Sequence, residues 1–256
     1  RAAYDAPFPE EANRVAAGHL ASLHFAPTPA ARENLLREGI AAADVHLTGN
    51  TGIDALRIAA EREVPLENGP SPGAPFALVT VHRRENLGEP LRRICEGIRL
   101  LHDRRPGLEF LWPLHPNPGV EPVVRELLGG LDRVRLVRPL DYGPFVTALK
   151  RAALILSDSG GVQEEAAALR TPILVLRGVS EREEAVAHGV ATLVGDDPAA
   201  IVREGTRYLA NPQKTARTFR DDSPFGDGRA TERIVAALRT RLLAARPEPA
   251  PEPVAV

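Results

Sequence analysis

Short apolar runs alternate with amphipathic stretches along most of the chain, and this alternation limits the fold more than any other feature. Eight runs have the length of strands, at 23–26, 45–48, 76–81, 108–113, 134–137, 153–156, 173–176 and 192–194. Helical spacing of apolar residues fills the gaps, at 29–38, 53–61, 90–104, 120–128, 144–151, 161–169, 181–188 and 199–209. Strands that alternate with helices predict an α/β fold with a doubly wound, mostly parallel sheet.

The strands divide the chain into unequal parts. Six of them lie within 63–215, enough for one complete Rossmann-type domain, whereas 1–62 holds two and is expected to be the end of an upstream domain. Four prolines at 64–75 indicate a linker between them. A closing helix is expected at 230–245, within a segment 216–245 that packs back toward the N-terminal domain. The tail at 246–256 alternates Pro, Glu and Ala, and we expect it to be disordered.

Composition excludes several classes of function. A net charge of −2 argues against a surface that coats nucleic acid. No apolar run reaches the length of about 18 residues that spans a membrane. The single cysteine, Cys95, excludes an internal disulfide framework and a cysteine-based zinc site. We therefore expect a cytoplasmic protein without nucleic-acid or membrane partners.

A serine and two glycines follow the strand expected at 153–156 and open the next helix. Ser159, Gly160 and Gly161 expose backbone N–H groups at a helix N-terminus, where the helix dipole favours an anion. Neither glycine has a Cβ atom, so a diphosphate could approach closely. The pattern is neither a Walker A loop nor a GxGxxG fingerprint, which disfavours ATP and NAD. Glu165 could accept hydrogen bonds from a ribose; the alternative is a plain turn with Ser159 as N-cap.

Four further motifs follow other expected strands. His82 and Arg83 suit phosphate oxygens, unless they belong to a solvated basic turn. His115 stands among prolines that stiffen its turn, although a lone histidine is more often structural. Phe145 could flank a flat base or anchor a helix in the core, and Arg182 could bind an anion or pair with a neighbouring glutamate. Since all five motifs follow strands of one parallel sheet, we expect them to line one cleft.

Taken together, these motifs resemble bacterial non-hydrolysing UDP-N-acetylglucosamine 2-epimerases. HRREN at 82–86, PLHPNP at 113–118, PLDYGPF at 139–145 and DSGGVQEE at 158–165 occur in the order and spacing of that family. So do PFPEEANR at 7–14, LHFAPT at 23–28, TGNTGIDAL at 48–56 and SPFGDGRATERI at 223–234. The resemblance covers residues 4 to about 240 and is specific to this family.

The resemblance implies a glycosyltransferase-B-like fold of two Rossmann-type domains, with 63–215 as the UDP-binding one. It implies that UDP-N-acetylglucosamine is inverted at C2 to UDP-N-acetylmannosamine for cell-surface polysaccharide biosynthesis. The reaction eliminates UDP, forms 2-acetamidoglucal and adds UDP back, without a cofactor or a metal. Members of the family are commonly homodimers.

Residue roles follow from the same resemblance. The amides of Ser159, Gly160 and Gly161 would hold the leaving diphosphate with His82 as a further donor, and Glu10 would exchange protons at C2. Without the resemblance, the favoured interpretation of Glu10 is a surface residue at the N-terminus of a helix that follows Pro9. Glu165 would bind the ribose, and Phe145 and the backbone of Leu140 would contact the uracil. Arg182 would bind a phosphate or sugar oxygen. Arg83 and His115 could contact a second, regulatory UDP-N-acetylglucosamine.

The chain departs from the family in two respects. Two catalytic carboxylates and a phosphate-binding arginine stand upstream of PFPEE in family members, whereas this sequence starts beside that motif and contains no methionine. We therefore expect an N-terminally truncated chain. The family's ERPE is Glu181-Arg-Glu-Glu184 here, without the proline that starts a helix. The alternatives are a hydrolysing epimerase that releases ManNAc and UDP, a glycosyltransferase of the same fold, or a non-catalytic UDP-sugar-binding module.

Overall fold

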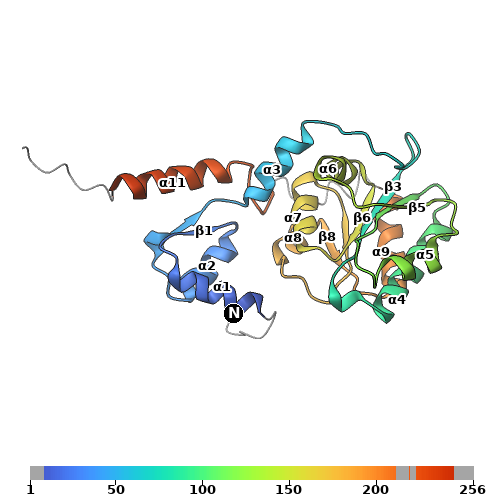
Figure 1. Cartoon of the computed structure of the whole chain (residues 1–256), viewed down its shortest axis with the longest axis horizontal. Helices are drawn as coiled ribbons and strands as arrows, with labels where there is room; N and C mark the ends of the chain where they lie inside the picture. Colours follow the sequence, from blue (N-terminus) through green and yellow to red (C-terminus); the bar gives the residue numbers. More distant parts are fainter. Residues whose placement is uncertain (1–8, 212–218, 220–222, 245–256) are drawn as a thin grey trace, which may run out of the picture. The chain divides into compact units, whose positions relative to one another are not determined.

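The computed structural model describes residues 9–211, 219 and 223–244, and its contacts form two units (Figure 1). The first unit contains the described residues up to Asp54 and those from Gly228 onward, and the second runs from Ala55 to Asp227. The tail expected at 246–256 lies outside the described residues. Among the described helices, none is long and apolar enough to cross a membrane.

The second unit is built on a six-stranded sheet in which every pairing is parallel. Its strands are β3 (Phe76–Thr80), β4 (Glu109–Pro113), β5 (Val134–Val137), β6 (Leu154–Ser157), β7 (Ile173–Val175) and β8 (Ala191–Leu193). Their order, β5-β4-β3-β6-β7-β8, is the Rossmann order 3-2-1-4-5-6 counted from β3. The expected α/β, doubly wound parallel fold is therefore confirmed, and each strand end falls within one residue of its expected position.

Seven α-helices of this unit lie in the described segments and alternate with the strands. They are α4 (Glu89–Arg104), α5 (Glu121–Leu128), α6 (Tyr142–Arg151), α7 (Gly160–Leu169), α8 (Glu183–His188), α9 (Pro198–Ala210) and the end of α3 (Thr51–Ala60). Figure 1 shows α4, α5 and α9 on one face of the sheet and α6, α7 and α8 on the other. Because helices cover both faces, the central strand β3 is continuously apolar and its residues from Phe76 to Val79 are buried.

Two glycines allow α4 and α9 to pack closely. A Cβ on Gly97 would lie 2.8 Å from Cδ1 of Ile201 and 3.1 Å from the backbone Cα of Pro198. A Cβ on Gly205 would lie 2.8 Å from Cδ2 of Leu101. A larger residue at Gly97 would push against the backbone of α9, which cannot move easily, whereas at Gly205 the leucine side-chain end could shift to make room.

The expected linker at 64–75 is irregular and lies within the second unit, where it hydrogen-bonds to other residues of that unit. The backbone N–H of Val64 donates to Oγ1 of Thr147 at 3.0 Å, and that of Ser71 donates to Glu109 at 3.1 Å. Arg135 pairs with the same carboxylate at 2.9 Å. This ion pair offsets part of the free-energy cost of burying the charged Glu109, which is only 9% exposed. These contacts attach the segment to the sheet.

In the first unit, β1 (His24–Ala26) pairs in parallel with β2 (Val45–Leu47). Its helices are α1 (Glu10–Leu20), α2 (Pro29–Arg37), the short η1 (Ala42–Asp44), the start of α3, and α11 (Ala230–Ala244). Helix α1 was not among the helical ranges expected from the sequence. The carboxylate of Asp54 accepts the first N–H groups of α11, from Ala230 at 3.1 Å and Thr231 at 2.7 Å. Arg233 donates to the backbone oxygen of Thr48 at 2.9 Å. The closing helix thus returns to residues near the start of the chain.

Candidate active site at the sheet switch point

The loops after β3 and β6 begin side by side, because Thr80 and Ser157 are paired at the ends of these strands. From β3 the chain continues outward to β4, and from β6 it continues in the opposite direction to β7. Such a reversal of strand order separates the following loops and opens a crevice at the carboxyl edge, where ligands of doubly wound sheets bind. The HRREN and DSGG motifs follow these two strands.

The turn between β6 and α7 presents an open helix N-terminus. Ser159 occupies the N-cap position, but its hydroxyl makes no capping hydrogen bond within the described chain. A Cβ on Gly161 would meet no atom within 4 Å, whereas one on Gly160 would lie 3.5 Å from the Arg182 guanidinium. The first N–H groups of α7 are therefore available to an anion, with an arginine beside them.

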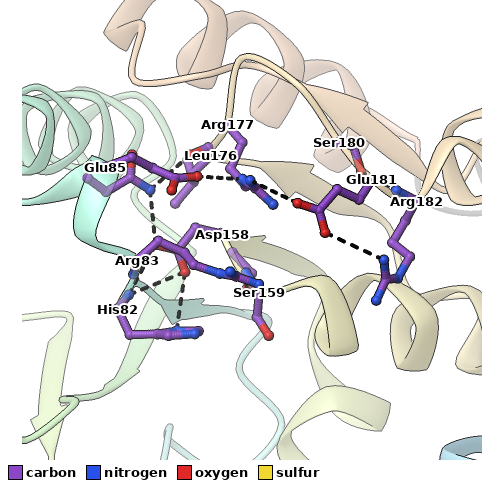
Figure 2. Close-up of polar contacts among 12 residues, drawn as sticks. His82, Arg83, Glu85, Asp158, Ser159, Leu176, Arg177, Ser180, Glu181 and Arg182 are labelled. Atoms are coloured by element: carbon purple, nitrogen blue, oxygen red, sulfur yellow. Dashed lines mark hydrogen bonds and ion pairs between the residues drawn. The ribbon is translucent and has the colours of Figure 1, made fainter. Parts of the chain in front are cut away.

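The carboxylate of Asp158 ties this turn to the loop after β3 (Figure 2). Asp158 is fully buried, and its Oδ2 accepts the backbone N–H groups of His82 at 3.1 Å and Arg83 at 2.9 Å. The amide of Asn86, within the short helix η2 (Arg84–Asn86), donates to the same oxygen at 2.9 Å and to Leu176 at 3.0 Å. Oδ1 lies 3.3 Å from Nδ1 of the His82 ring. One carboxylate thus holds His82 next to the anion-binding turn.

Arg182 approaches the turn from the loop after β7. Its guanidinium pairs with Glu164 of α7, and Glu181 lies 3.8 Å away. Its backbone N–H donates to Oγ of Ser180 at 3.0 Å, and that hydroxyl donates to the buried Gln163 at 2.6 Å. A partner among the neighbouring glutamates was anticipated, and Glu181 is one. The pairing with Glu164 was missed. Helix α8 starts two residues later than expected, at Glu183, which leaves Arg182 in the loop.

Glu165 lies one turn into α7 and accepts a hydrogen bond from the hydroxyl of Tyr142 at 3.1 Å. Burial raises the pKa of the Glu165 carboxyl, the nearby Glu164 charge raises it further, and the Tyr142 hydrogen bond lowers it. Burial and the Glu165 charge together raise the pKa of Tyr142 to about 12. Tyr142 therefore stays protonated and remains a donor. Phe145 follows in the first turn of α6, half-buried, with Leu140 in the preceding loop.

His115 extends the site along the loop after β4. Its ring stacks on that of His82, with centroids 5.6 Å apart and planes 25° apart. Its Nδ1 accepts the backbone N–H of Asn117 at 3.2 Å. Nearby, Nε of Arg83 is buried and has no hydrogen-bond partner among the described residues.

The structure thus brings most of the expected residues to one edge of the second unit. These residues all follow carboxyl ends of strands in the same sheet. They are His82, Arg83, His115, Leu140, Phe145, the turn at 159–161, Glu165 and Arg182. Glu10 lies in the first unit, exposed at the start of α1. Sequence reasoning missed Asp158 and Tyr142, although both stand inside the recognised motifs.

Surface hollows also occur in other parts of the described chain. No group of three or more His, Cys, Asp or Glu side chains within 9–211, 219 and 223–244 is arranged to hold a metal ion. One surface hollow is lined by residues of α3 and α6, including Val146 and Lys150, and another by residues of α4, including Arg92 and Cys95. Both lack the residues of the carboxyl edge.

Comparison with known proteins agrees with these motifs. Residues 2–239 match the model of the family described as UDP-N-acetylglucosamine 2-epimerase. A UDP-N-acetylglucosamine 2-epimerase of Escherichia coli (strain K12) is 42% identical over 243 residues, which cover 91% of this chain and 65% of that relative. A probable UDP-N-acetylglucosamine 2-epimerase of Ralstonia nicotianae has the same identity and coverage. The chain thus spans 65% of the length of these curated relatives.

Solved structures give the same result. A putative UDP-N-acetylglucosamine 2-epimerase of Listeria monocytogenes has a TM-score of 0.88 and 39% identity, covering 96% of this chain and 65% of that one. The Neisseria meningitidis UDP-GlcNAc 2-epimerase, solved bound to UDP-GlcNAc, has a TM-score of 0.84 and 38% identity, covering 93% and 66%. The wall teichoic acid polymerase TagF, at 11% identity and a TM-score of 0.56, shares the fold alone. These neighbours agree with the expected glycosyltransferase-B-like fold class.

Proposed function

Because the chain belongs to the UDP-N-acetylglucosamine 2-epimerase family, we propose that the protein inverts C2 of UDP-N-acetylglucosamine to give UDP-N-acetylmannosamine. The observation that carries this proposal is the open N-terminus of α7, where Gly161 leaves free space beside His82 and Arg182. The bound UDP-GlcNAc of the Neisseria meningitidis relative supports the choice of ligand.

In this proposal the second unit holds the nucleotide. The amides of Gly160 and Gly161 bind the diphosphate, and His82 and Arg182 add positive charge or hydrogen-bond donors. The amide of Ser159, expected to take part, instead donates to the hydroxyl of Ser157 at 3.0 Å. Glu165 accepts hydrogen bonds from the ribose hydroxyls while Tyr142 holds its carboxylate. Phe145 lies against the uracil, and the backbone of Leu140 contacts its edge.

The chemistry is an elimination followed by an addition. A carboxylate removes the C2 proton, the bond between the anomeric carbon and the diphosphate oxygen breaks, and UDP leaves with that electron pair. Donors at the turn stabilise the charge that develops on UDP as it leaves. Protonation of the resulting 2-acetamidoglucal from the opposite face and re-addition of UDP give the epimer. We assign Glu10 to proton exchange at C2. No electrons are gained or lost overall, so the scheme needs no redox cofactor.

Three further assignments belong to the same proposal. Arg83 and His115 are candidates for binding a second, regulatory UDP-N-acetylglucosamine. The positive charge of Arg83 supports an anionic ligand there, as does its buried Nε, which has no hydrogen-bond partner among the described residues. We also propose a homodimer and a cytoplasmic location, as in the sequence-based expectation.

The proposal is tested by incubating the protein with UDP-N-acetylglucosamine in deuterated water. We expect UDP-N-acetylmannosamine that carries deuterium at C2. Free ManNAc with UDP would indicate the hydrolysing reaction, and consumption that depends on an acceptor sugar would indicate a glycosyltransferase. An epimer without deuterium would refute the elimination. If the chain binds UDP but converts no substrate, it functions as a UDP-sugar-binding module and not as an enzyme.

A further inference from the structure

The hydrogen bonds of Asp158 are divided unequally between its two oxygens. Oδ2 accepts three donors, from the backbone of His82 and Arg83 and from the amide of Asn86. Oδ1 has one backbone contact, from His82 at 3.2 Å, and lies 3.3 Å from Nδ1 of the same residue's ring. This 3.3 Å separation is an ion-pair distance, and because a carboxyl oxygen has two lone pairs, Oδ1 has one left for an N–H of the ring.

An ionised carboxylate accepts hydrogen bonds and cannot donate them. Nδ1 of His82 must therefore carry a proton wherever it bonds to Oδ1. A neutral ring protonated at Nδ1 has no proton at Nε2. No described residue hydrogen-bonds Nε2, and the side chain is 35% exposed. Nε2 is thus left without a partner among the described residues, while Asp158 lies beside the ring (Figure 2) and its Oδ1 is 3.3 Å from the opposite nitrogen.

We propose that Asp158 is a positioning residue, which fixes the ring orientation and tautomer of His82 so that Nδ1 carries the fixed proton and Nε2 faces the ligand. Nε2 then donates to a diphosphate oxygen only when the ring carries a second proton, and the Asp158 carboxylate offsets that positive charge. The role of Nε2 toward the diphosphate rests on the proposed function, whereas the tautomer can be measured without any ligand. The charged and titratable groups around the ring are Asp158, the stacked His115 and the adjacent Arg83.

The unequal sharing makes Asp158→Asn a sharp test. The three donors at Oδ2 require an oxygen there, so the amide nitrogen of the substituted side chain takes the place of Oδ1. This nitrogen donates, and it forces Nδ1 of His82 to become the acceptor and Nε2 to carry the proton. The substitution keeps the shape of the side chain while it reverses the tautomer. A neutral Nε2–H then replaces the charge-assisted donor of the protonated ring, and this weaker hydrogen bond should reduce UDP affinity about tenfold.

The tautomer is read by NMR of the full chain labelled with ¹⁵N-histidine, with the His82 signals assigned by their loss in His82→Gln. At a pH where the ring is neutral, we expect protonated Nδ1 in the wild type and protonated Nε2 in Asp158→Asn. Asn86→Ala is the matched control, because it removes a donor to the same carboxylate without touching the ring and should leave Nδ1 protonated. A wild-type ring protonated at Nε2 would overturn the proposal, even if Asp158→Asn fails to fold.

A double-mutant cycle separates positioning from simple loss of structure. If Asp158 acts through the ring, Asp158→Asn should weaken UDP binding about tenfold alone and have little further effect in the His82→Gln background. Equal losses in both backgrounds would mean that Asp158 only supports the turn, and would refute the role in positioning. A wild-type chain that shows the Nδ1 tautomer but binds no UDP would instead contradict the proposed function.

Discussion

Replacing Gly161 by alanine separates ligand binding from folding at the candidate site. The added Cβ meets no atom of the protein within 4 Å, and the residue does not have a positive φ. Alanine is favoured over glycine in helices by up to about 1 kcal/mol, so the free energy of unfolding should stay the same or rise by that amount. The methyl group would nevertheless lie where a diphosphate approaches the first N–H groups of α7.

The expected loss of affinity follows from the hydrogen bonds involved. A hydrogen bond to a charged group contributes roughly 1.5–3 kcal/mol, so losing one backbone bond to the diphosphate should weaken UDP binding roughly 10- to 150-fold. Isothermal titration calorimetry measures this change, and urea unfolding of the same samples measures stability. Both quantities are needed, because only a loss of affinity at constant stability identifies a ligand site.

Gly107→Ala is the matched control. A Cβ at Gly107 also meets no atom within 4 Å, but this residue precedes β4 at the amino edge of the sheet, opposite the site. It should leave UDP affinity unchanged. Equal UDP affinity for Gly161→Ala and the wild type would refute the argument that the helix N-terminus binds the diphosphate.

Three further substitutions test the site and the fold. Glu165→Gln should weaken UDP binding. Burial raises the pKa of the Glu165 carboxyl in the folded protein, so the wild type should lose stability relative to this variant as pH rises through that pKa. Urea unfolding of both proteins from about pH 4 to 8 would show this difference. A pH-independent difference would contradict the burial of its charge. Gly97→Ala should lower the free energy of unfolding by about 1–2 kcal/mol, since overpacking against Ile201 outweighs the gain in helix propensity; a more stable variant would contradict this packing. Asp54→Ala should destabilise α11 by about 0.5–2 kcal/mol, seen as faster amide exchange at its first turn, and unchanged exchange there would rule out the cap.

Local sequence patterns predicted the second unit well because its central strands, such as β3 and β6, are buried on both faces. Continuous apolar runs such as β3 and β6 are hard to mistake when turn residues bound them, and their ends fell within one residue. Helix α1 was outside the expected helical ranges and was anticipated only through the alternative interpretation of Glu10. Its pattern is weak, because it starts after Pro9 without a side-chain cap and buries only Glu11. Its stability depends on contacts that a local pattern does not reveal.

The site was predicted in its ligand-facing residues but not in the residues that support them. Asp158 and Tyr142 meet their partners 23 to 76 positions away, and no spacing rule links such pairs. The partner of Arg182 illustrates the same limit. The sequence around Arg182 contains three glutamates that could pair with it. In the fold, Arg182 also pairs with Glu164, which lies in helix α7, 18 positions earlier in the chain. Motifs identify which groups a ligand meets, while the supporting hydrogen bonds appear only with the topology.

The attachment of α11 to Asp54 and Thr48 also sets an order of events during synthesis. The groups that these two residues bind are 176 to 185 positions further along the chain. At about 5–20 residues per second, a ribosome needs roughly 10–35 s to supply them. The six-stranded sheet is fully translated before that, so the Rossmann-type unit can fold while the first unit still waits for its last helix.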